Sequence, residues 1–176
     1  MKKIYLGIDN GVSGTIALID ADGTPIWFDT VPTKVEQSYT KTKQNITRID
    51  YQKFKEFITT PISYNGNVIF DSKFDYHQLV AIFERPMINP GRFKATMSAL
   101  RALESTLILL EEFEIPIHYI DSKEWQKVLL PKGISKEALK IASLDIGNRY
   151  FPLFKSHRHP DRDALLIAEW GRRNNI

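Results

Sequence analysis

Acidic residues follow or open three apolar segments of this 176-residue chain. Carboxylates at the strand ends of one sheet can converge, and a cluster of negative charge is costly unless cations neutralise it. The acids in question are Asp9 after the apolar run 4–8, Glu84 after the run 79–83, and Asp161 and Asp163 just before the run 164–168.

A convergent group of these four acids predicts a site for hard divalent cations. Carboxylate oxygens favour Mg²⁺ or Mn²⁺, and the absence of cysteine excludes thiolate zinc sites, disulfides and a cysteine nucleophile. Two such ions can activate a water and stabilise the leaving 3′ oxygen of a phosphodiester, with no covalent intermediate. We therefore expect Asp9, Glu84, Asp161 and Asp163 to be catalytic and to bind Mg²⁺ or Mn²⁺, with two ions per active site.

Each acid taken alone has a structural alternative. Asp9 fits a turn former before Asn10-Gly11. Glu84 fits an ion pair with Arg85 or Lys94, and the two aspartates before the run 164–168 fit helix N-caps. Only the combination of the three segments along one chain favours catalysis.

The pattern of apolar residues predicts the elements that must position the acids. Runs at 4–8, 15–19 and 25–28, joined by tight glycine turns, predict an antiparallel meander, and 79–83 and 115–120 predict two more strands. Helical spacing occurs at 49–58, 93–113, 136–150 and 164–170, and another helix follows Asp121 or Ser122. The polar segment 31–45 is predicted to be a loop. This order predicts one α/β domain over 1–176, a central mixed five-stranded sheet flanked by helices.

Three segments resemble the acidic motifs of RuvC-like Holliday junction resolvases: Gly7-Ile8-Asp9-Asn10-Gly11, Phe83-Glu84-Arg85-Pro86, and Asp163 with the apolar run that follows it. The similarity is to the phage and organellar branch, where a His-rich stretch precedes the acid of an apolar last helix. It implies a ribonuclease-H-like fold and a homodimeric, Mg²⁺- or Mn²⁺-dependent endonuclease. The implied substrates are four-way and other branched DNA junctions, cut by phosphodiester hydrolysis.

Two positions depart from the resolvase pattern. Bacterial members usually have proline after the first aspartate, where this chain has Asn10. The last motif usually offers an acid or a histidine three to five residues before its final acid, but Pro160 stands three before Asp163. Asp161 and His159 are both candidates for that ligand; hardness favours Asp161 for Mg²⁺, and His159 suits a ligand or a proton shuttle.

Basic and aromatic residues predict the DNA-binding surface. Arg92, Phe93 and Lys94 open a predicted helix just after Glu84, where cations and backbone N–H groups suit a phosphate and Phe93 suits stacking at the branch point. The alternative for Phe93 is packing in the core. Lys123 and Lys127 are further candidates, and the segment 122–131 that holds them also resembles the DNA-facing segment of the resolvases. Trp125 between them is expected in the core.

Bulk charge agrees with this surface without demanding it. The net charge is +3, but eleven lysines and arginines face six acids from Ser122 onward. No apolar run is long enough to span a bilayer, and the N-terminal run carries an acid at position 9. We expect no membrane partner and a cytoplasmic protein, in the host cytoplasm if a phage encodes it.

Three rival functions fit parts of the pattern. A non-catalytic protein that binds branched DNA can share the fold, and a less selective cutter of branched DNA can share the site. Asp9-Asn10-Gly11 followed by Thr15 also resembles the phosphate loop of the actin and sugar-kinase superfamily. Those proteins need two related domains and are usually much longer than this chain.

Overall fold

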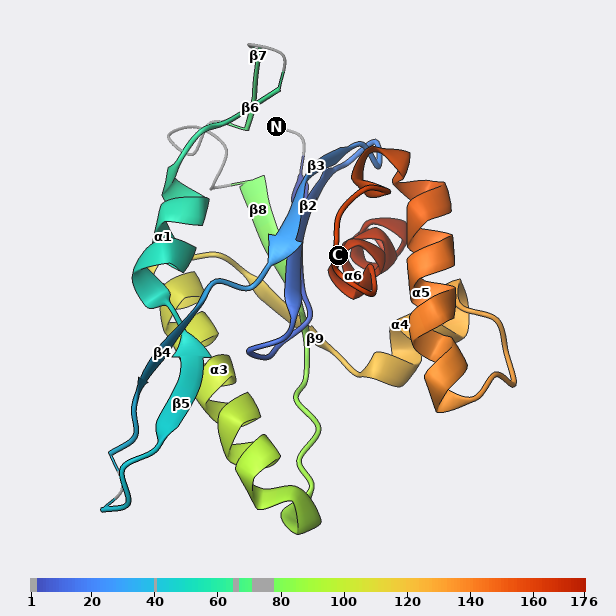
Figure 1. The fold of residues 1–176 in the computed structure, drawn as a ribbon. Coiled ribbons are helices and arrows are strands. Elements are labelled where there is room, and N and C mark those ends of the chain that lie inside the picture. Colours follow the sequence, from blue (N-terminus) through green and yellow to red (C-terminus); the bar gives the residue numbers. More distant parts are fainter. Residues whose placement is uncertain (1–2, 40, 65–66, 71–77) are drawn as a thin grey trace.

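The computed structural model describes residues 3–39, 41–64, 67–70 and 78–176. Its centre is a five-stranded sheet in the order β3-β2-β1-β8-β9 (Figure 1). Strands β1 (Ile4–Ile8), β2 (Thr15–Asp20) and β3 (Pro25–Thr30) form the predicted antiparallel meander. Strand β8 (Leu79–Glu84) runs parallel to β1, and β9 (Ile117–Ile120) runs parallel to β8. The mixed sheet expected from the sequence is confirmed.

Helices cover both faces of this sheet (Figure 1). On one face lie α1 (Tyr51–Thr59) and α3 (Phe93–Glu112), which follows the short 3-10 helix η2 (Pro90–Arg92). On the other lie α4 (Ser122–Leu129), α5 (Lys136–Tyr150) and α6 (Asp163–Arg173), with the 3-10 helix η3 (Pro152–Phe154) after α5. Within the described ranges, no helix is long and apolar enough to cross a membrane.

Side chains that cap helices fix where several of them begin. Asp50 accepts a hydrogen bond from the backbone N–H of Lys53 at the start of α1. Asp121 and Glu124 form a capping box at the start of α4, and Ser135 accepts from the N–H of Ala138 in α5. These contacts satisfy N–H groups that have no partner inside the helix.

Two hydrophobic cores lie on the two faces of the sheet. Successive side chains of a strand point to opposite faces, so Leu6 and Ile8 of β1 pack toward α1 and α3, whereas Tyr5 packs toward α6. Strands β1 and β8 are buried on both faces, which explains why each is a continuous apolar run in the sequence.

A close approach between β1 and α6 matters for the site. A Cβ atom at Gly7 would overlap the backbone carbonyl oxygen of Ala164 and crowd Ala168. Because glycine has no Cβ, α6 packs directly on the end of β1. The first turn of α6 therefore lies next to the residue that follows β1, which is Asp9.

The expected loop at 31–45 is wrong at both of its ends. Strands β4 (Thr33–Gln37) and β5 (Asn45–Ile49) pair as an antiparallel hairpin beside α3, and Arg48 forms a 3.1 Å ion pair with Glu36 across it. Most of its side chains are exposed or half-buried, so the apolar alternation that reveals a half-buried strand is missing. A second hairpin joins β6 (Ile62–Tyr64) and β7 (Asn67–Phe70).

Candidate metal centre

The parallel pairing of β1 and β8 brings two of the predicted acids to the same edge of the sheet. Ile8 at the end of β1 is in register with Phe83, so Asp9 follows one strand where Glu84 ends its neighbour. The backbone N–H of Asp9 donates to the carbonyl of Thr15 at 3.0 Å, which fixes the start of the turn. The direction of the two strands therefore positions both carboxylates.

Three of the four predicted acids form a compact group. One carboxylate oxygen from each of Asp9, Asp161 and Asp163 can be chosen so that all three lie within 4.8 Å of one another. Asp161 is only 3% exposed, whereas the other two are half-buried. Residues separated by about 150 positions in the sequence thus meet because α6 packs on β1.

Glu84 lies outside this compact group but interacts with it electrostatically. Its Oε2 accepts a 2.6 Å hydrogen bond from Nε1 of Trp125, which is 1% exposed. The expected core position of Trp125 is therefore correct, and its indole N–H has a second role that the sequence did not indicate. The alternative ion pair of Glu84 with Arg85 does not form, because Arg85 pairs with Asp121 at 3.1 Å.

Burial and repulsion by neighbouring acids raise the pKa values of Asp9, Glu84 and Asp163. Desolvation, followed by the charges of Asp163, Glu84 and Asp161, holds the pKa of Asp9 well above its usual value. Desolvation is also the main cause that raises the pKa of Glu84 to about 7, against the lowering effect of the Trp125 hydrogen bond. Desolvation and the charge of Asp161 raise the pKa of Asp163 to about 6.

Protein cations neutralise this group only weakly. Among the described lysines and arginines, Lys140 alone reaches an acid of the site, with its Nζ 3.9 Å from Oδ2 of Asp161. Its side chain is 71% exposed, so solvent screens the pair. Clustered carboxylate oxygens without a matching positive charge are the donor set that Mg²⁺ or Mn²⁺ prefers. The residues present therefore fit a divalent cation.

His159 lies beside Asp161 rather than within the compact group. Its Nδ1 is 3.1 Å from Oδ1 of Asp161, and its Nε2 is 3.3 Å from the backbone carbonyl of Ser13. Both ring nitrogens thus contact protein oxygens. Of the two candidates for the last ligand, the structure brings Asp161 into the group and places His159 where it orients that carboxylate.

The helix-capping alternative accounts for little of this geometry. Arg162 precedes α6 without a side-chain capping bond, and Oδ1 of Asp161 meets the N–H of Asp163 only at 3.4 Å. Oδ1 of Asp163 instead accepts a hydrogen bond from the hydroxyl of Ser143 in α5. The two aspartates therefore face the neighbouring acids more than the end of their own helix.

Arg162, between the two aspartates, is a residue that sequence reasoning missed. It is almost fully buried, and its guanidinium donates to the backbone carbonyls of Phe154, His157, His159 and Asp161. These bonds fix the segment that leads into α6. An arginine in a basic stretch ordinarily indicates an exposed contact to DNA, and nothing in the sequence distinguishes this buried one.

The predicted DNA-binding residues are exposed, and one of them adjoins the acids. Arg92 and Glu84 line the same cavity of about 240 Å³, together with Asn10. Phe93 is 69% exposed, so its alternative position in the core is not observed. Lys94 is exposed beside it at the start of α3, and Lys123 and Lys127 are exposed on α4.

Comparison with known proteins finds matches in the fold but none in the amino-acid sequence. No protein family model matches the chain, and no curated protein matches it in sequence. Solved structures do match: the mixed sheet flanked by helices is the ribonuclease-H-like fold of RuvC.

Two of the matching structures are of RuvC from Thermus thermophilus. One is RuvC in complex with a Holliday junction substrate, with a TM-score of 0.54 and 13% identity over 99% of this chain and 97% of that one. The other is RuvC described without a substrate, with a TM-score of 0.55 and 13% identity over 98% of this chain and 96% of that one. At this identity the similarity establishes the fold alone.

Proposed function

We propose that this protein is a metal-dependent endonuclease that cuts four-way and other branched DNA. The observation that carries the proposal is the group formed by Asp9, at the end of β1, with Asp161 and Asp163, at the start of α6, in a RuvC-type fold. Burial and repulsion raise the pKa values of Asp9 and Asp163 in this group, and perturbed pKa values cluster at functional sites. The junction substrate in the matching RuvC structure supports branched DNA as the partner.

The side chains around the acids have definable roles in this proposal. Asp9, Asp161 and Asp163, with Glu84 at the rim, would hold Mg²⁺ or Mn²⁺, two ions per site. Divalent cations held by these acids would supply the electrostatic stabilisation that phosphodiester hydrolysis requires. Trp125 orients Glu84 and Ser143 orients Asp163, so two fixed donors keep the carboxylates in place.

The surface beside the acids supplies the contacts to DNA. Arg92 and Lys94 would bind the phosphate backbone, and the exposed ring of Phe93 would stack on a base at the branch point. Lys123 and Lys127 extend the basic surface onto α4. We further propose that the chain acts as a single domain and as a homodimer, since a junction has two related strands to cut. We also propose that the protein belongs to the phage and organellar branch of the resolvases and acts in the cytoplasm.

A substrate panel tests this function. Labelled four-way, three-way and linear duplexes are incubated with the protein in Mg²⁺, in Mn²⁺ and in EDTA. We expect metal-dependent cleavage of the branched substrates and little cleavage of the linear duplex. Equal cleavage of all three would favour a less selective nuclease, and junction binding without cleavage in either metal would favour a non-catalytic DNA-binding protein.

A further inference from the structure

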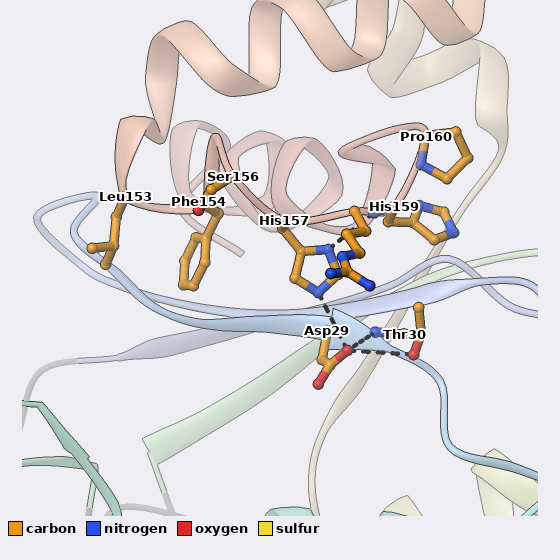
Figure 2. A pocket seen from close by; sticks show the side chains of 9 residues that line it. Asp29, Thr30, Leu153, Phe154, Ser156, His157, His159 and Pro160 are labelled. Carbon is orange, nitrogen blue, oxygen red and sulfur yellow. Dashed lines mark hydrogen bonds and ion pairs between the residues drawn. The ribbon is translucent and has the colours of Figure 1, made fainter.

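A groove of about 690 Å³ lies beside the metal centre, between the end of β3 and the segment 153–160 that precedes α6 (Figure 2). It is larger than the cavity that adjoins Glu84, and it is lined by β3 and the segment before α6 instead of by the end of β8 and the start of α3. Its volume falls within the range of about 300–1,000 Å³ that small-molecule sites usually occupy. None of the roles given to Asp9, Glu84, Asp161 and Asp163 uses this groove.

The sheet places the groove close to the carboxylates. Thr30, which lines it, pairs with Thr15, and the carbonyl of Thr15 accepts the N–H of Asp9. Adjacent strands are about 4.8 Å apart, so two strand spacings, roughly 10 Å, separate Asp9 from this wall of the groove. On the other wall, His159 lines the groove and contacts Asp161. A DNA strand with a phosphate at the acids would therefore need only a nucleotide or two to reach the groove.

The lining combines flat rings, one carboxylate and one exposed cation. The ring of Phe154 and the imidazole of His157 extend from the segment before α6 toward β3 (Figure 2). Oδ1 of Asp29 accepts from the N–H of Thr30 at 2.6 Å and lies 3.3 Å from Nε2 of His157. Oδ2 of Asp29 takes part in neither contact, and the side chain of Asp29 is half exposed. Arg158 adds an exposed cation at the same groove.

This set of groups fits a nucleotide better than other small ligands. Flat rings suit a nucleobase, a cation suits its phosphate, and a carboxylate suits an N–H donor on the base edge. A simple anion would be repelled by the charge of Asp29, and a purely apolar ligand would cover Oδ2 of Asp29 without offering it a hydrogen-bond donor, at a cost in free energy.

The groove is also preorganised. The guanidinium of Arg162 binds the backbone carbonyls of Phe154, His157 and His159, so the wall that carries these rings is held from behind. The same guanidinium stacks over the ring of Phe28 in β3, with its carbon 5.3 Å from the ring centroid. A wall fixed before binding loses little conformational entropy when a ligand enters.

We propose that this groove binds one unstacked nucleobase of the cut strand, a nucleotide or two from the scissile phosphate, and selects a base that carries an amino group. The proposal rests on the proposed nuclease function. Asp29 accepts a hydrogen bond from the exocyclic amino group of cytosine, adenine or guanine. Thymine has no amino group and offers carbonyl oxygens on both sides of its N–H, so its edge repels the carboxylate. Arg158 binds the adjoining phosphate without reading the base.

A base scan of the cut strand tests the selection. Junctions that differ only in one base near the cut are compared in single-turnover cleavage by wild type, Asp29→Asn and the control Asp145→Asn, an exposed acid on α5. We expect one position where thymine slows wild-type cleavage by about fivefold or more, the effect of one lost base contact. Asp29→Asn should remove that difference, and Asp145→Asn should keep it. A preference that persists in Asp29→Asn, or its absence in wild type, would overturn the proposal.

A binding measurement keeps this test independent of cleavage. The fluorescent base 2-aminopurine is placed at successive positions near the branch, and its emission is recorded as Asp163→Asn, with EDTA present, binds the junction. Entry of the base into the groove should unstack it and raise its emission at one or two positions. Adding Asp29→Ala should reduce that rise, whereas adding Asp145→Asn should not. If the protein does not cleave junctions but this signal appears, the proposed nuclease function is wrong and the groove still binds a base. If no position gives the signal, the groove does not bind a base and the proposal is wrong.

Discussion

Trp125 links the core of the protein to its candidate active site. The ring is buried among the side chains of the core that α4 and α6 share, and its N–H is the hydrogen-bond donor to Glu84. That bond lowers the pKa of Glu84, while burial raises it. The ionisation of Glu84 therefore depends on one indole nitrogen.

Trp125→Phe tests this dependence. The substitution keeps an aromatic ring and removes the N–H, so the pKa of Glu84 should rise above its present value of about 7. Cleavage near neutral pH should fall several-fold and recover as the pH increases, because metal binding needs the ionised carboxylate. The measurement is the pH profile of the single-turnover rate. Trp27→Phe, on β3 and away from the acids, is the matched control, and identical profiles for the two variants would show that the bond does not matter.

Only part of the site could be predicted from single residues. Asp9 and Glu84 follow buried strands, and their positions are visible in the sequence because apolar runs mark strand ends. The sequence could not decide whether Asp161 or His159 is the last metal ligand, because the answer depends on the direction in which each side chain points from one short segment. Arg162 was missed because its role depends on four backbone carbonyls that come together only when the chain folds.

At the level of elements, the start of α3 is where the proposed recognition of branched DNA lies. Arg92 shares a cavity with Glu84, and the ring of Phe93 is exposed beside Lys94. Because the ring of Phe93 is 69% exposed at the start of α3, packing in the core does not explain it. Because the ring is exposed, removing it should affect the recognition of DNA more than the stability of the fold, and a mutation can measure the two effects separately.

Phe93→Ala should leave the melting temperature nearly unchanged and reduce the preference for a four-way junction over a linear duplex. Stacking of a base on an aromatic ring contributes on the order of 1–3 kcal/mol, so the preference should drop by about fivefold or more. Competition binding at fixed salt measures it, with Ile141→Ala, an exposed residue of α5, as the control. A large loss of melting temperature with no change in preference would instead assign the ring to folding.

The elements themselves were largely predictable, with one informative failure. Strands β1, β2, β3 and β8 and helix α5 follow from apolar runs and helical spacing because each buries at least one face. The hairpin β4–β5 was missed because most of its side chains face solvent. Several of them are charged and form ion pairs with one another, so its sequence does not alternate between apolar and polar residues. The spacing of apolar residues predicts only those elements that bury a face, so it does not predict a hairpin that is mostly exposed.

For the molecule as a whole, the repulsion among the acids makes its stability depend on pH and metal. The pKa values of Asp9, Glu84 and Asp163 are raised in the folded protein relative to their ordinary values. Such groups stabilise the fold fully at pH values below their unfolded pKa, near 4, and that stabilisation is lost as the pH rises through the folded values of about 6 to 7. Metal binding acts in the opposite direction because it needs ionised carboxylates.

In EDTA, the melting temperature should therefore fall as the pH is raised from about 5 to about 8. Millimolar Mg²⁺ or Mn²⁺ should restore it at the upper end of this range and have little effect at the lower end. Asp163→Asn should show a smaller fall in EDTA and a smaller restoration by metal. Thermal denaturation across this range provides the measurement, and a melting temperature indifferent to metal at high pH would contradict a cation site at these acids.

The central claim is that the acids at the ends of β1 and β8 and at the start of α6 form the active site of a DNA endonuclease, and single-turnover cleavage of a four-way junction in Mg²⁺ tests it most directly. Wild type is compared with Asp9→Asn, Glu84→Gln and Asp163→Asn, with Asp145→Asn as the control and junction affinity measured in parallel. We predict that wild type and the control cleave, and that each of the three variants binds the junction but cleaves about a hundredfold more slowly or not at all, since even groups that only support a metal ligand are worth about 10–100-fold. Cleavage at the wild-type rate by any of the three would remove that residue from the site, and wild-type rates in all three would contradict the claim.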